Sequence, residues 1–394
     1  MSKFRFLLSV IAVMCMWAPA PSYAAPTKRG FQILLNSIDD AALSDLVTNW
    51  KVNFLRIQIG NDMEMDGKTG AAYDAMMEEQ FDLLDEKLPL IAAHGLKVIF
   101  ILYSPPGGFQ TRQGPSHYQM FSDPALQTAF IDKWKEIMTR YGSNETIMAF
   151  DLVNEPASRK GLLAAGALPW GNLAKQTIAA IRTIAPTRTL IVKPLYGDPG
   201  KLAGLPAFND GNVEYAYNSY YFLKYQHTGV TEAPFSINRP EQSRLKDKME
   251  SILAPFFFKM KARADAGDIP ASAYPPKLNV GEVAVSGCAR ESEVYLADLL
   301  TLLEVDNGNE GQIRRDSRIR RYRRRKRRGF DVVRPVFEAD DFVLDIKHSG
   351  YAIHAYDESR YWDPRYVCNS DGSFTLSSTD TGRATVLKSF FSRN

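Results

Sequence analysis

The chain alternates short apolar runs rich in strand-forming residues with longer amphipathic stretches, and this rhythm restricts its fold more than any other feature. Such alternation predicts parallel strands joined by crossover helices. The runs with strand character cover residues 31–35, 54–59, 97–103, 147–153, 189–192, 213–219, 277–283 and 350–355. Eight strand units are the number that a closed α/β barrel, the (β/α)8 or TIM barrel, requires. An open α/β sheet is the competing architecture, and the eight units favour the barrel.

Helical patterns fall between the strand runs. They cover residues 40–50, 76–93, 124–141, 173–185, 240–264 and 291–303. The connection between the fifth and sixth strand runs is the weakest, because residues 197–208 are rich in glycine and proline, which are poor helix formers. A chain of 394 residues that is 45% apolar suits one large domain. We therefore expect a single barrel domain over residues 25–394.

One segment does not fit the barrel pattern. Residues 305–346 interrupt the rhythm before the eighth strand, and within them residues 314–328 hold ten arginines, Lys326 and a single aspartate. Such a run repels itself and cannot pack, so we expect an inserted loop that is partly disordered. It could bind a polyanion, but a tolerated insertion without a role is favoured, since Tyr322 is its one aromatic residue. The rest of the chain is acidic, so no nucleic-acid partner is expected.

The N-terminus has the composition of a targeting segment. Lys3 and Arg5 precede an apolar stretch over residues 6–17, and Ser22-Tyr23-Ala24 offers the small residues that a signal peptidase reads. The stretch falls short of the ~20 residues that span a bilayer, which argues against a membrane anchor. We expect a signal peptide at 1–24, a secreted protein (extracellular or periplasmic), and no membrane attachment after cleavage.

The cysteines are too few for a disulfide scaffold or a cysteine-rich metal site. Cleavage after residue 24 would remove Cys15 and leave Cys288 and Cys368. These follow the seventh and eighth strand runs, and neighbouring strands have neighbouring loops. We expect a disulfide between Cys288 and Cys368 in an oxidising compartment, with two free thiols as the alternative.

Two glutamates stand directly at the ends of apolar strand runs. Residues 147–153 lead into Asn154-Glu155-Pro156, and residues 278–281 lead into Glu282. Active sites of α/β barrels collect at the C-terminal strand ends, and the fourth and seventh strands face each other across the barrel mouth. Either residue alone would more often be a solvated rim residue. Two carboxyl groups across one cleft, one acidic and one ionised, are what glycosidic-bond hydrolysis requires.

At this point the chain resembles glycoside hydrolase family 5, the cellulase-like retaining enzymes, over nearly all of the mature length except the insertion. The motifs that carry the resemblance are Lys28-Arg29-Gly30-Phe31, Asn53-Phe54-Leu55-Arg56, Ser104-Pro105-Pro106-Gly107-Gly108, residues 150–156, Tyr225-Gln226-His227-Thr228-Gly229, Gly281-Glu282 and Trp362-Asp363. The resemblance implies that Glu155 is the acid/base and Glu282 the nucleophile. It also places Arg56 beneath Glu282 to keep it ionised. Asn154 would hydrogen-bond a sugar hydroxyl, and no metal or organic cofactor is required.

The chain departs from the family at two places where a histidine is usual. Tyr103 occupies the one after the third strand, and Asn218 the one on the sixth strand, followed by Tyr220, with Tyr221 as an alternative for the family's tyrosine. These changes put the substrate in doubt more than the reaction.

Sugar rings stack on aromatic side chains. Trp362 is the best candidate for such a platform, with Trp170 and Tyr103 after it. Trp50 and Trp134 sit in helical patterns and are expected to be packing residues.

The sequence therefore predicts a retaining glycosidase that acts on a β-linked polysaccharide. An endo-β-1,4-glucanase is the simplest form, and a β-mannanase or an exo-β-1,3-glucanase of the same family is nearly as well supported. From a different class, a non-catalytic carbohydrate-binding barrel is the alternative. The retention of both Glu155 and Glu282 argues against it. The oligomeric state stays open.

Overall fold

The computed structural model describes residues 28–60, 65–108, 117–221, 240–283, 285, 291–304, 348–356, 363–369 and 373–392. The predicted signal peptide, the predicted insertion at 305–346, Cys288 and Trp362 lie outside these residues, so what was expected of them stays a prediction. Within the described part of the chain, no helix combines the length and apolar character needed to cross a bilayer.

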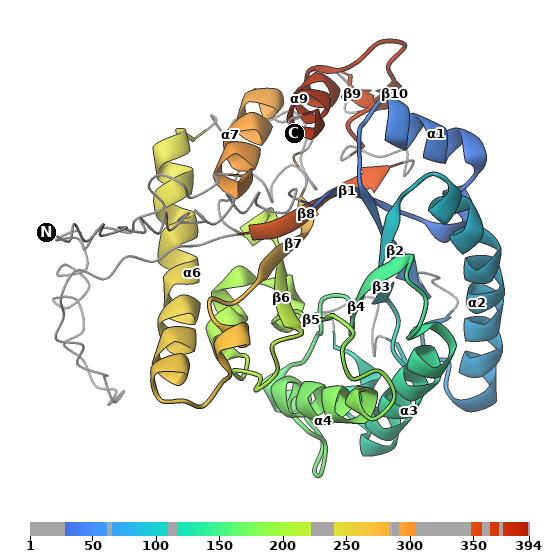
Figure 1. Ribbon diagram of the computed structural model, residues 1–394, viewed down its shortest axis with the longest axis vertical. Coiled ribbons are helices and arrows are strands. Elements are labelled where there is room, and N and C mark those ends of the chain that lie inside the picture. Colours follow the sequence, from blue (N-terminus) through green and yellow to red (C-terminus); the bar gives the residue numbers. More distant parts are fainter. Residues whose placement is uncertain are drawn as a thin grey trace, which may run out of the picture.

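Eight parallel strands close into a barrel in sequence order, and the last pairs with the first (Figure 1). The strands are β1 (Lys28–Ile33), β2 (Phe54–Ile59), β3 (Lys97–Leu102), β4 (Ile147–Asp151), β5 (Leu190–Val192), β6 (Val213–Asn218), β7 (Leu278–Val283) and β8 (His348–Tyr356). This confirms the predicted (β/α)8 fold. The first strand begins three residues earlier than expected, and Leu35 belongs to a 3-10 turn, η1 (Leu35–Ser37).

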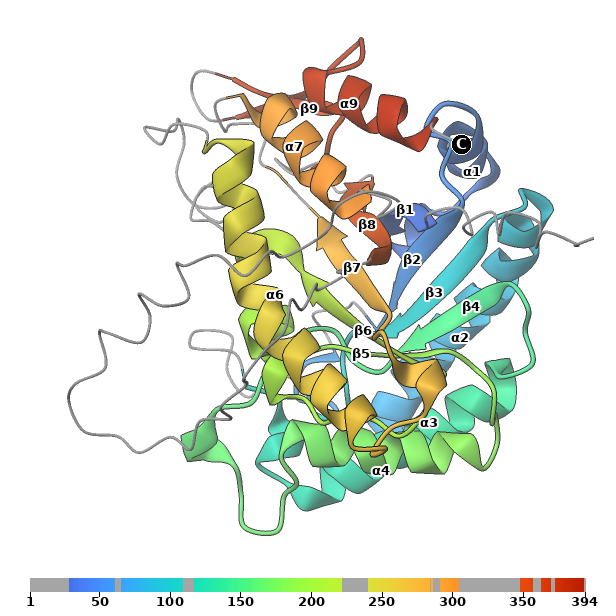
Figure 2. The same ribbon diagram turned by 60° about the vertical axis from the view of Figure 1, so that its left-hand side comes forward.

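The helices form a ring outside the strands (Figure 1). They are α1 (Asp40–Thr48), α2 (Gly70–Ala93), α3 (Pro124–Tyr141), α4 (Trp170–Arg182), α6 (Gln242–Asp265), α7 (Ser292–Glu304) and α9 (Gly382–Phe391). In Figure 2, α6 and α7 lie side by side, and α9 contacts α7. A short antiparallel pair, β9 (Tyr366–Cys368) and β10 (Phe374–Leu376), precedes α9.

Short 3-10 helices complete the connections: η3 (Gln119–Phe121), η4 (Lys160–Leu162), η5 (Leu195–Gly197), η6 (Pro199–Gly204), η7 (Ser219–Tyr221) and η8 (Ala271–Ala273). The connection from β5 to β6 contains η5 and η6 and no α-helix. The glycines and prolines of this segment explain the difference, since neither sustains an α-helix in its interior.

The residues that point into the barrel form two layers. Side chains alternate between the two faces of a strand, so residues two apart along it share a face. Four strands repeat one step, in which a buried apolar residue is followed two positions later by a buried polar one nearer the C-terminal mouth. These pairs are Phe54 and Arg56, Ala149 and Asp151, Ile191 and Lys193, and Ala216 and Asn218. The apolar layer closes the lower barrel, and the polar layer forms the floor of the mouth.

Gly30 on β1 is required by the close approach of β2. A Cβ atom there would lie 2.3 Å from the carbonyl oxygen of Phe54 and 2.8 Å from its ring. Backbone cannot move aside cheaply, so we expect Gly30→Ala to lower the free energy of unfolding by about 2 kcal/mol. Gly204→Ala is the matched control, because nothing lies within 4 Å of its Cβ position. Thermal unfolding of both variants tests this, and equal melting temperatures would contradict it.

Candidate active site

Glu282 is held at both carboxylate oxygens at the end of β7. Arg56 Nη1 on β2 donates to Oε1 at 3.0 Å, and the Tyr220 hydroxyl donates to Oε2 at 3.0 Å. Glu282 is 5% exposed, so its carboxylate is hydrogen-bonded mainly by protein groups and little by water. Of the two tyrosines considered from the sequence, Tyr220 thus makes the contact with Glu282. A carboxylate with donors on both oxygens and one edge toward the mouth is oriented as a nucleophile needs to be.

Arg56 is the hub of the polar layer and is almost completely buried. Besides Glu282, it donates from Nη1 to Gln32 Oε1 and from Nη2 to Asn154 Oδ1 at 2.8 Å. Asp151 Oδ2 lies 3.8 Å from Nη2. The planar guanidinium therefore sets the relative positions of side chains from β1, β2, β4 and β7, which a flexible ammonium group could not do as rigidly.

Glu155 follows β4 with a backbone φ of 44°, in the left-handed region that non-glycine residues seldom adopt. Its Oε1 accepts a hydrogen bond from Asn218 Nδ2. Burial, and next the negative charge of Glu282, raise the pKa of Glu155 to about 7, although Lys193, Asn218 and Arg56 oppose the shift. Glu155 is thus protonated where an unperturbed glutamate would be ionised, which is the state a general acid needs.

Asn154 is oriented by its neighbours. Its Oδ1 accepts from Arg56 and, at 3.2 Å, from Lys193 Nζ, so the amide nitrogen is the end that can face a sugar hydroxyl. Its backbone carbonyl accepts from the Tyr118 hydroxyl at 2.7 Å. The same hydroxyl lies 3.3 Å from the carbonyl of Tyr103, which is partly buried at the end of β3. Tyr103 therefore stands at the same mouth as the two glutamates.

Lys193 was not predicted from the sequence. It follows β5 directly and is completely buried, with Nζ 3.2 Å from Asn218 Oδ1, 3.6 Å from Asp151 Oδ2 and 3.9 Å from Glu282 Oε1. The rule that selected the two glutamates, a charged residue directly after an apolar strand run, also selects Lys193. Glycosidic-bond hydrolysis calls for carboxyl groups, so the sequence offered no reason to single out a lysine.

Asp151 was inside a motif that the sequence highlighted, but it was given no role. It is buried on β4, and its carboxylate is the counter-ion of both Arg56 and Lys193. Burial raises its pKa, and the two cations oppose that shift. The site therefore contains two cations, Arg56 and Lys193, and two anions, Asp151 and Glu282, so Glu282 is not the sole anionic partner of the two cations.

The other aromatic predictions divide. Trp50 and Trp134 are buried in the core, which confirms them as packing residues. The suggestion that Trp170 is a sugar platform is wrong, because it is 3% exposed. Its indole instead donates to the carbonyl of Lys193 at 2.7 Å. A tryptophan at the N-terminus of a helix can point into the core as readily as into a cleft, which sequence position does not reveal.

Cys368 ends β9 and is disulfide-bonded. Since Cys288 lies outside the described residues, the pairing of these two cysteines stays a prediction.

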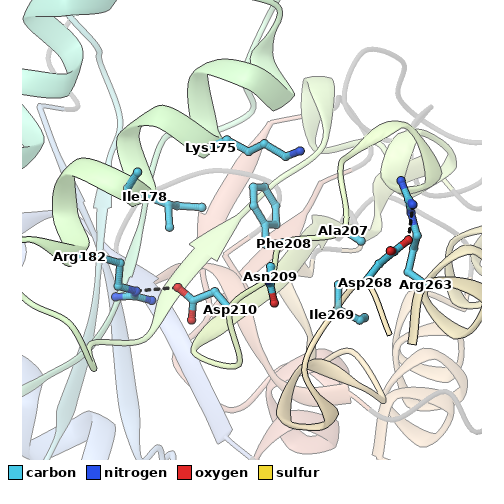
Figure 3. A pocket seen from close by; sticks show the side chains of 11 residues that line it. Lys175, Ile178, Arg182, Ala207, Phe208, Asn209, Asp210, Arg263, Asp268 and Ile269 are labelled. Carbon is cyan, nitrogen blue, oxygen red and sulfur yellow. Dashed lines mark hydrogen bonds and ion pairs between the residues drawn. The ribbon is translucent and has the colours of Figure 1, made fainter. Parts of the chain in front are cut away.

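A pocket of about 570 Å³ lies away from these side chains, between α4, the residues before β6 and the end of α6 (Figure 3). Its lining includes Arg182, which donates to Asp210 at 2.6 Å. Asp210 and Ile269 precede β6 and β7, so the pocket opens toward the N-terminal end of the barrel. It lies beside the connection that lacks an α-helix, and its lining does not include Glu155 or Glu282.

A (β/α)8 barrel with one glutamate after β4 and a second at the end of β7 has the arrangement expected of a glycoside hydrolase. Residues 22–271 match the model of the cellulase family, glycosyl hydrolase family 5. This match covers more than half of the chain. The chain therefore belongs to glycosyl hydrolase family 5.

Relatives and solved structures agree with this assignment. Cellodextrinase A of Ruminococcus flavefaciens is 24% identical over 189 residues, which cover 48% of this chain and 53% of the relative. Endoglucanase C of Acetivibrio thermocellus is 26% identical over 166 residues, covering 41% and 46%. The chain thus spans about half the length of these curated relatives.

The fold comparison extends over more of the chain. The endoglucanase Cel5A of Pseudomonas stutzeri superimposes with a TM-score of 0.59 at 14% identity, covering 95% of this chain and 97% of that one. The cellulose synthase subunit Z of Clostridioides difficile gives a TM-score of 0.56 at 16% identity, covering 92% and 99%. At this identity the likeness establishes the fold.

The raised pKa of Glu155 predicts a pH-dependent stability difference. The pKa is about 7 in the folded protein against an ordinary value of 4.5, so the folded state holds this proton more tightly. The resulting stabilisation is complete below pH 4.5 and is lost as the pH rises to about 7. Glu155→Gln carries no such proton. Relative to the wild type, the variant should gain about 1 to 3 kcal/mol between pH 4.5 and 8.

Chemical denaturation of both proteins at pH 4.5, 6 and 8 measures that gain. Comparing the two proteins at each pH cancels the titrating groups that do not interact with Glu155. A difference that does not change with pH would show that Glu155 titrates normally.

Proposed function

We propose that this protein hydrolyses β-linked glucan with retention of configuration, using Glu155 as the acid/base and Glu282 as the nucleophile. The observation that carries the proposal is that the two carboxyl groups have surroundings of opposite effect, one favouring the ionised form and the other the protonated form. Glu282 has a cationic donor and a hydroxyl donor on its two oxygens, which favours an ionised nucleophile. Glu155 is placed so that its pKa rises to about 7, which favours an acid.

In the first step, a Glu282 oxygen attacks the anomeric carbon and forms a glycosyl ester. The bond from that carbon to the leaving oxygen breaks, and its electron pair takes the proton of Glu155. In the second step, a water oxygen attacks the anomeric carbon, its proton passes to the Glu155 carboxylate, and the ester bond to Glu282 breaks. Both glutamates return to their starting states, so the cycle consumes only water and substrate.

Chain residues beside the two glutamates assist these steps. The Asn154 amide nitrogen is available for the hydroxyl next to the reacting carbon, because its oxygen is already held by two cations. Tyr220 and Arg56 keep the attacking carboxylate in place and lower the reorganisation that the attack requires.

The finer assignment that we propose is an endo-β-1,4-glucanase. The support is the family of the chain and the names of its matches, which include an endoglucanase and a cellodextrinase. A secreted enzyme would meet such a polymer directly, so we also propose that the predicted signal peptide exports it. A β-mannanase and an exo-β-1,3-glucanase use the same catalytic pair, and loop shape separates them.

Substitution of the two glutamates separates their roles. Glu282→Gln should lower kcat on an aryl β-cellobioside by about 10⁴-fold or more, since no ester can form. Glu155→Gln should lower kcat by about 10³-fold on a substrate with a poor leaving group. The first step with dinitrophenyl cellobioside should slow far less, because dinitrophenolate leaves without a proton. Glu86→Gln, with a carboxylate exposed to solvent, is the control. Full activity of Glu282→Gln would show that Glu282 is not the nucleophile.

The wild-type pH profile and a polymer panel complete the test. The value of kcat/KM should fall as the pH rises through about 7, because Glu155 loses its proton there. Carboxymethyl cellulose, mannan, xylan, lichenan and laminarin, with product sizes measured, distinguish the substrates and the endo or exo mode. Binding to a polymer without any hydrolysis would favour a carbohydrate-binding barrel instead.

A further inference from the structure

The proposed reaction transfers negative charge from Glu282 to Glu155 in a barrel mouth that is largely shielded from water. Before the first step, Glu282 is ionised and Glu155 is neutral. After it, Glu282 is an uncharged ester and Glu155 is a carboxylate. Shifting a charge in a medium of low polarity is costly unless the surroundings already stabilise both positions. A cation with access to both carboxyl groups would supply this.

Lys193 has that access. Its Nζ lies 3.9 Å from Glu282 Oε1, which is a direct ion pair with the nucleophile. The same Nζ donates to Asn218 Oδ1 at 3.2 Å, and Asn218 Nδ2 donates to Glu155 Oε1. The ammonium group therefore polarises an amide whose other end holds the acid/base. Hydrogen bonds in such a chain strengthen one another.

The surroundings keep Lys193 in this position. Its backbone carbonyl accepts from the buried Trp170 indole at 2.7 Å, which fixes the chain directly after β5. Gly281 makes room for the side chain, because a Cβ there would lie 2.8 Å from both Cε and Nζ of Lys193. Lys193 is completely buried, so it does not contact a substrate itself.

We propose that Lys193 is a positioning residue that acts through Asn218 to hold Glu155 and to stabilise the negative charge at both carboxyl positions. The proposal rests on the proposed function for its catalytic meaning. With Glu155 protonated, the two cations Arg56 and Lys193 face the two anions Asp151 and Glu282. With the ester formed, the same cations face Asp151 and Glu155, so the cluster stays balanced throughout.

This arrangement accounts for the unusual Asn218. A histidine is the family's usual residue there, whereas an asparagine is short enough to link Lys193 to Glu155. Its amide presents an acceptor to the ammonium group and a donor to the carboxyl group at the same time.

Several other groups face Glu155 and enter its titration. Arg56 comes from β2, Glu282 from β7, and Tyr220 from η7 after β6. Tyr118, before η3, also interacts with the charge of Glu155. Burial raises the pKa of both tyrosines well above the ordinary value, so they remain neutral over the range in which Glu155 titrates. Burial, and next the charge of Arg56, lower the pKa of Lys193 itself, while Asp151, Glu282 and Glu155 oppose that shift. The comparison of variants is therefore read from the Glu155 signal.

The test measures the Glu155 titration directly, without substrate. Side-chain ¹³C-labelled glutamate is followed by NMR from pH 4 to 10 in the wild type, Lys193→Met and Asn218→Ala, and Glu155→Gln identifies the signal. Both substitutions should raise the titration midpoint of Glu155 by about one pH unit, because each removes support for its ionised form. The double variant should shift by less than the sum, since the two residues act in one chain.

Kinetics on an aryl β-cellobioside provide the second readout. Lys193→Met should lower kcat by about 10- to 100-fold with KM changed by less than about threefold, because a buried residue affects charge development more than binding. The alkaline limb of kcat/KM should move upward together with the NMR midpoint. Lys135→Met removes a charge from an exposed lysine on α3 and is the matched control.

The outcomes separate the two proposals. A wild type without hydrolysis refutes the proposed function, while the NMR titration still tests the role of Lys193. An unchanged Glu155 midpoint in a folded Lys193→Met overturns the inference, whatever happens to the rate. If Lys193→Met does not fold, Asn218→Ala decides, since it keeps the cation and breaks the link. An unchanged midpoint in that variant overturns the inference as well.

Discussion

The contact between Arg56 and Glu282 is the interaction on which the rest of the site depends. A buried guanidinium and a buried carboxylate are each costly to dehydrate, and they persist together because both find further partners. Arg56 holds Gln32 and Asn154 as well, and Glu282 also accepts from Tyr220. Four strands of the barrel are thereby tied at the level where the polar layer begins. Replacing either member would leave an unpaired charge in the barrel.

The barrel makes such a charged layer tolerable by placing it on an apolar one. The alternation of each strand puts Phe54, Ile99, Ala149, Ile191 and Ala216 below the charged side chains and keeps water out from that end. Electrostatic interactions are stronger in such surroundings than in water. This is the physical reason why Glu155, which is buried and interacts with the charges of Glu282, Lys193 and Arg56, departs so far from its ordinary pKa. The catalytic asymmetry is therefore a property of the layers and not of the glutamates alone.

Lys193 and Asn218 show how a family's site can be rebuilt around different residues. The chain lacks two of the histidines usual in the family, yet Glu282 accepts a hydrogen bond at each oxygen and Glu155 accepts one from Asn218. The lysine brings a positive charge that a neutral imidazole would not, and Asp151 offsets it. The connection between β5 and β6 contains no α-helix, although the two strands still pair as parallel neighbours.

Much of this protein was determined by the sequence alone. The eight strand runs, the helices between them, and the positions of Glu155 and Glu282 at strand ends follow from periodicity and chain order, which local residues encode. Among the site residues named from the sequence, Arg56 and Tyr220 contact Glu282 and Asn154 contacts Arg56, while the roles expected of all three stay predictions. It did not reveal Lys193 and Asp151 as members of the site, because their importance lies in contacts between strands far apart in the chain. Nor did it show that Trp170 is buried or that Asn218 joins a lysine to Glu155. Those facts depend on distances across a closed barrel, and only the tertiary structure brings these side chains within hydrogen-bonding range.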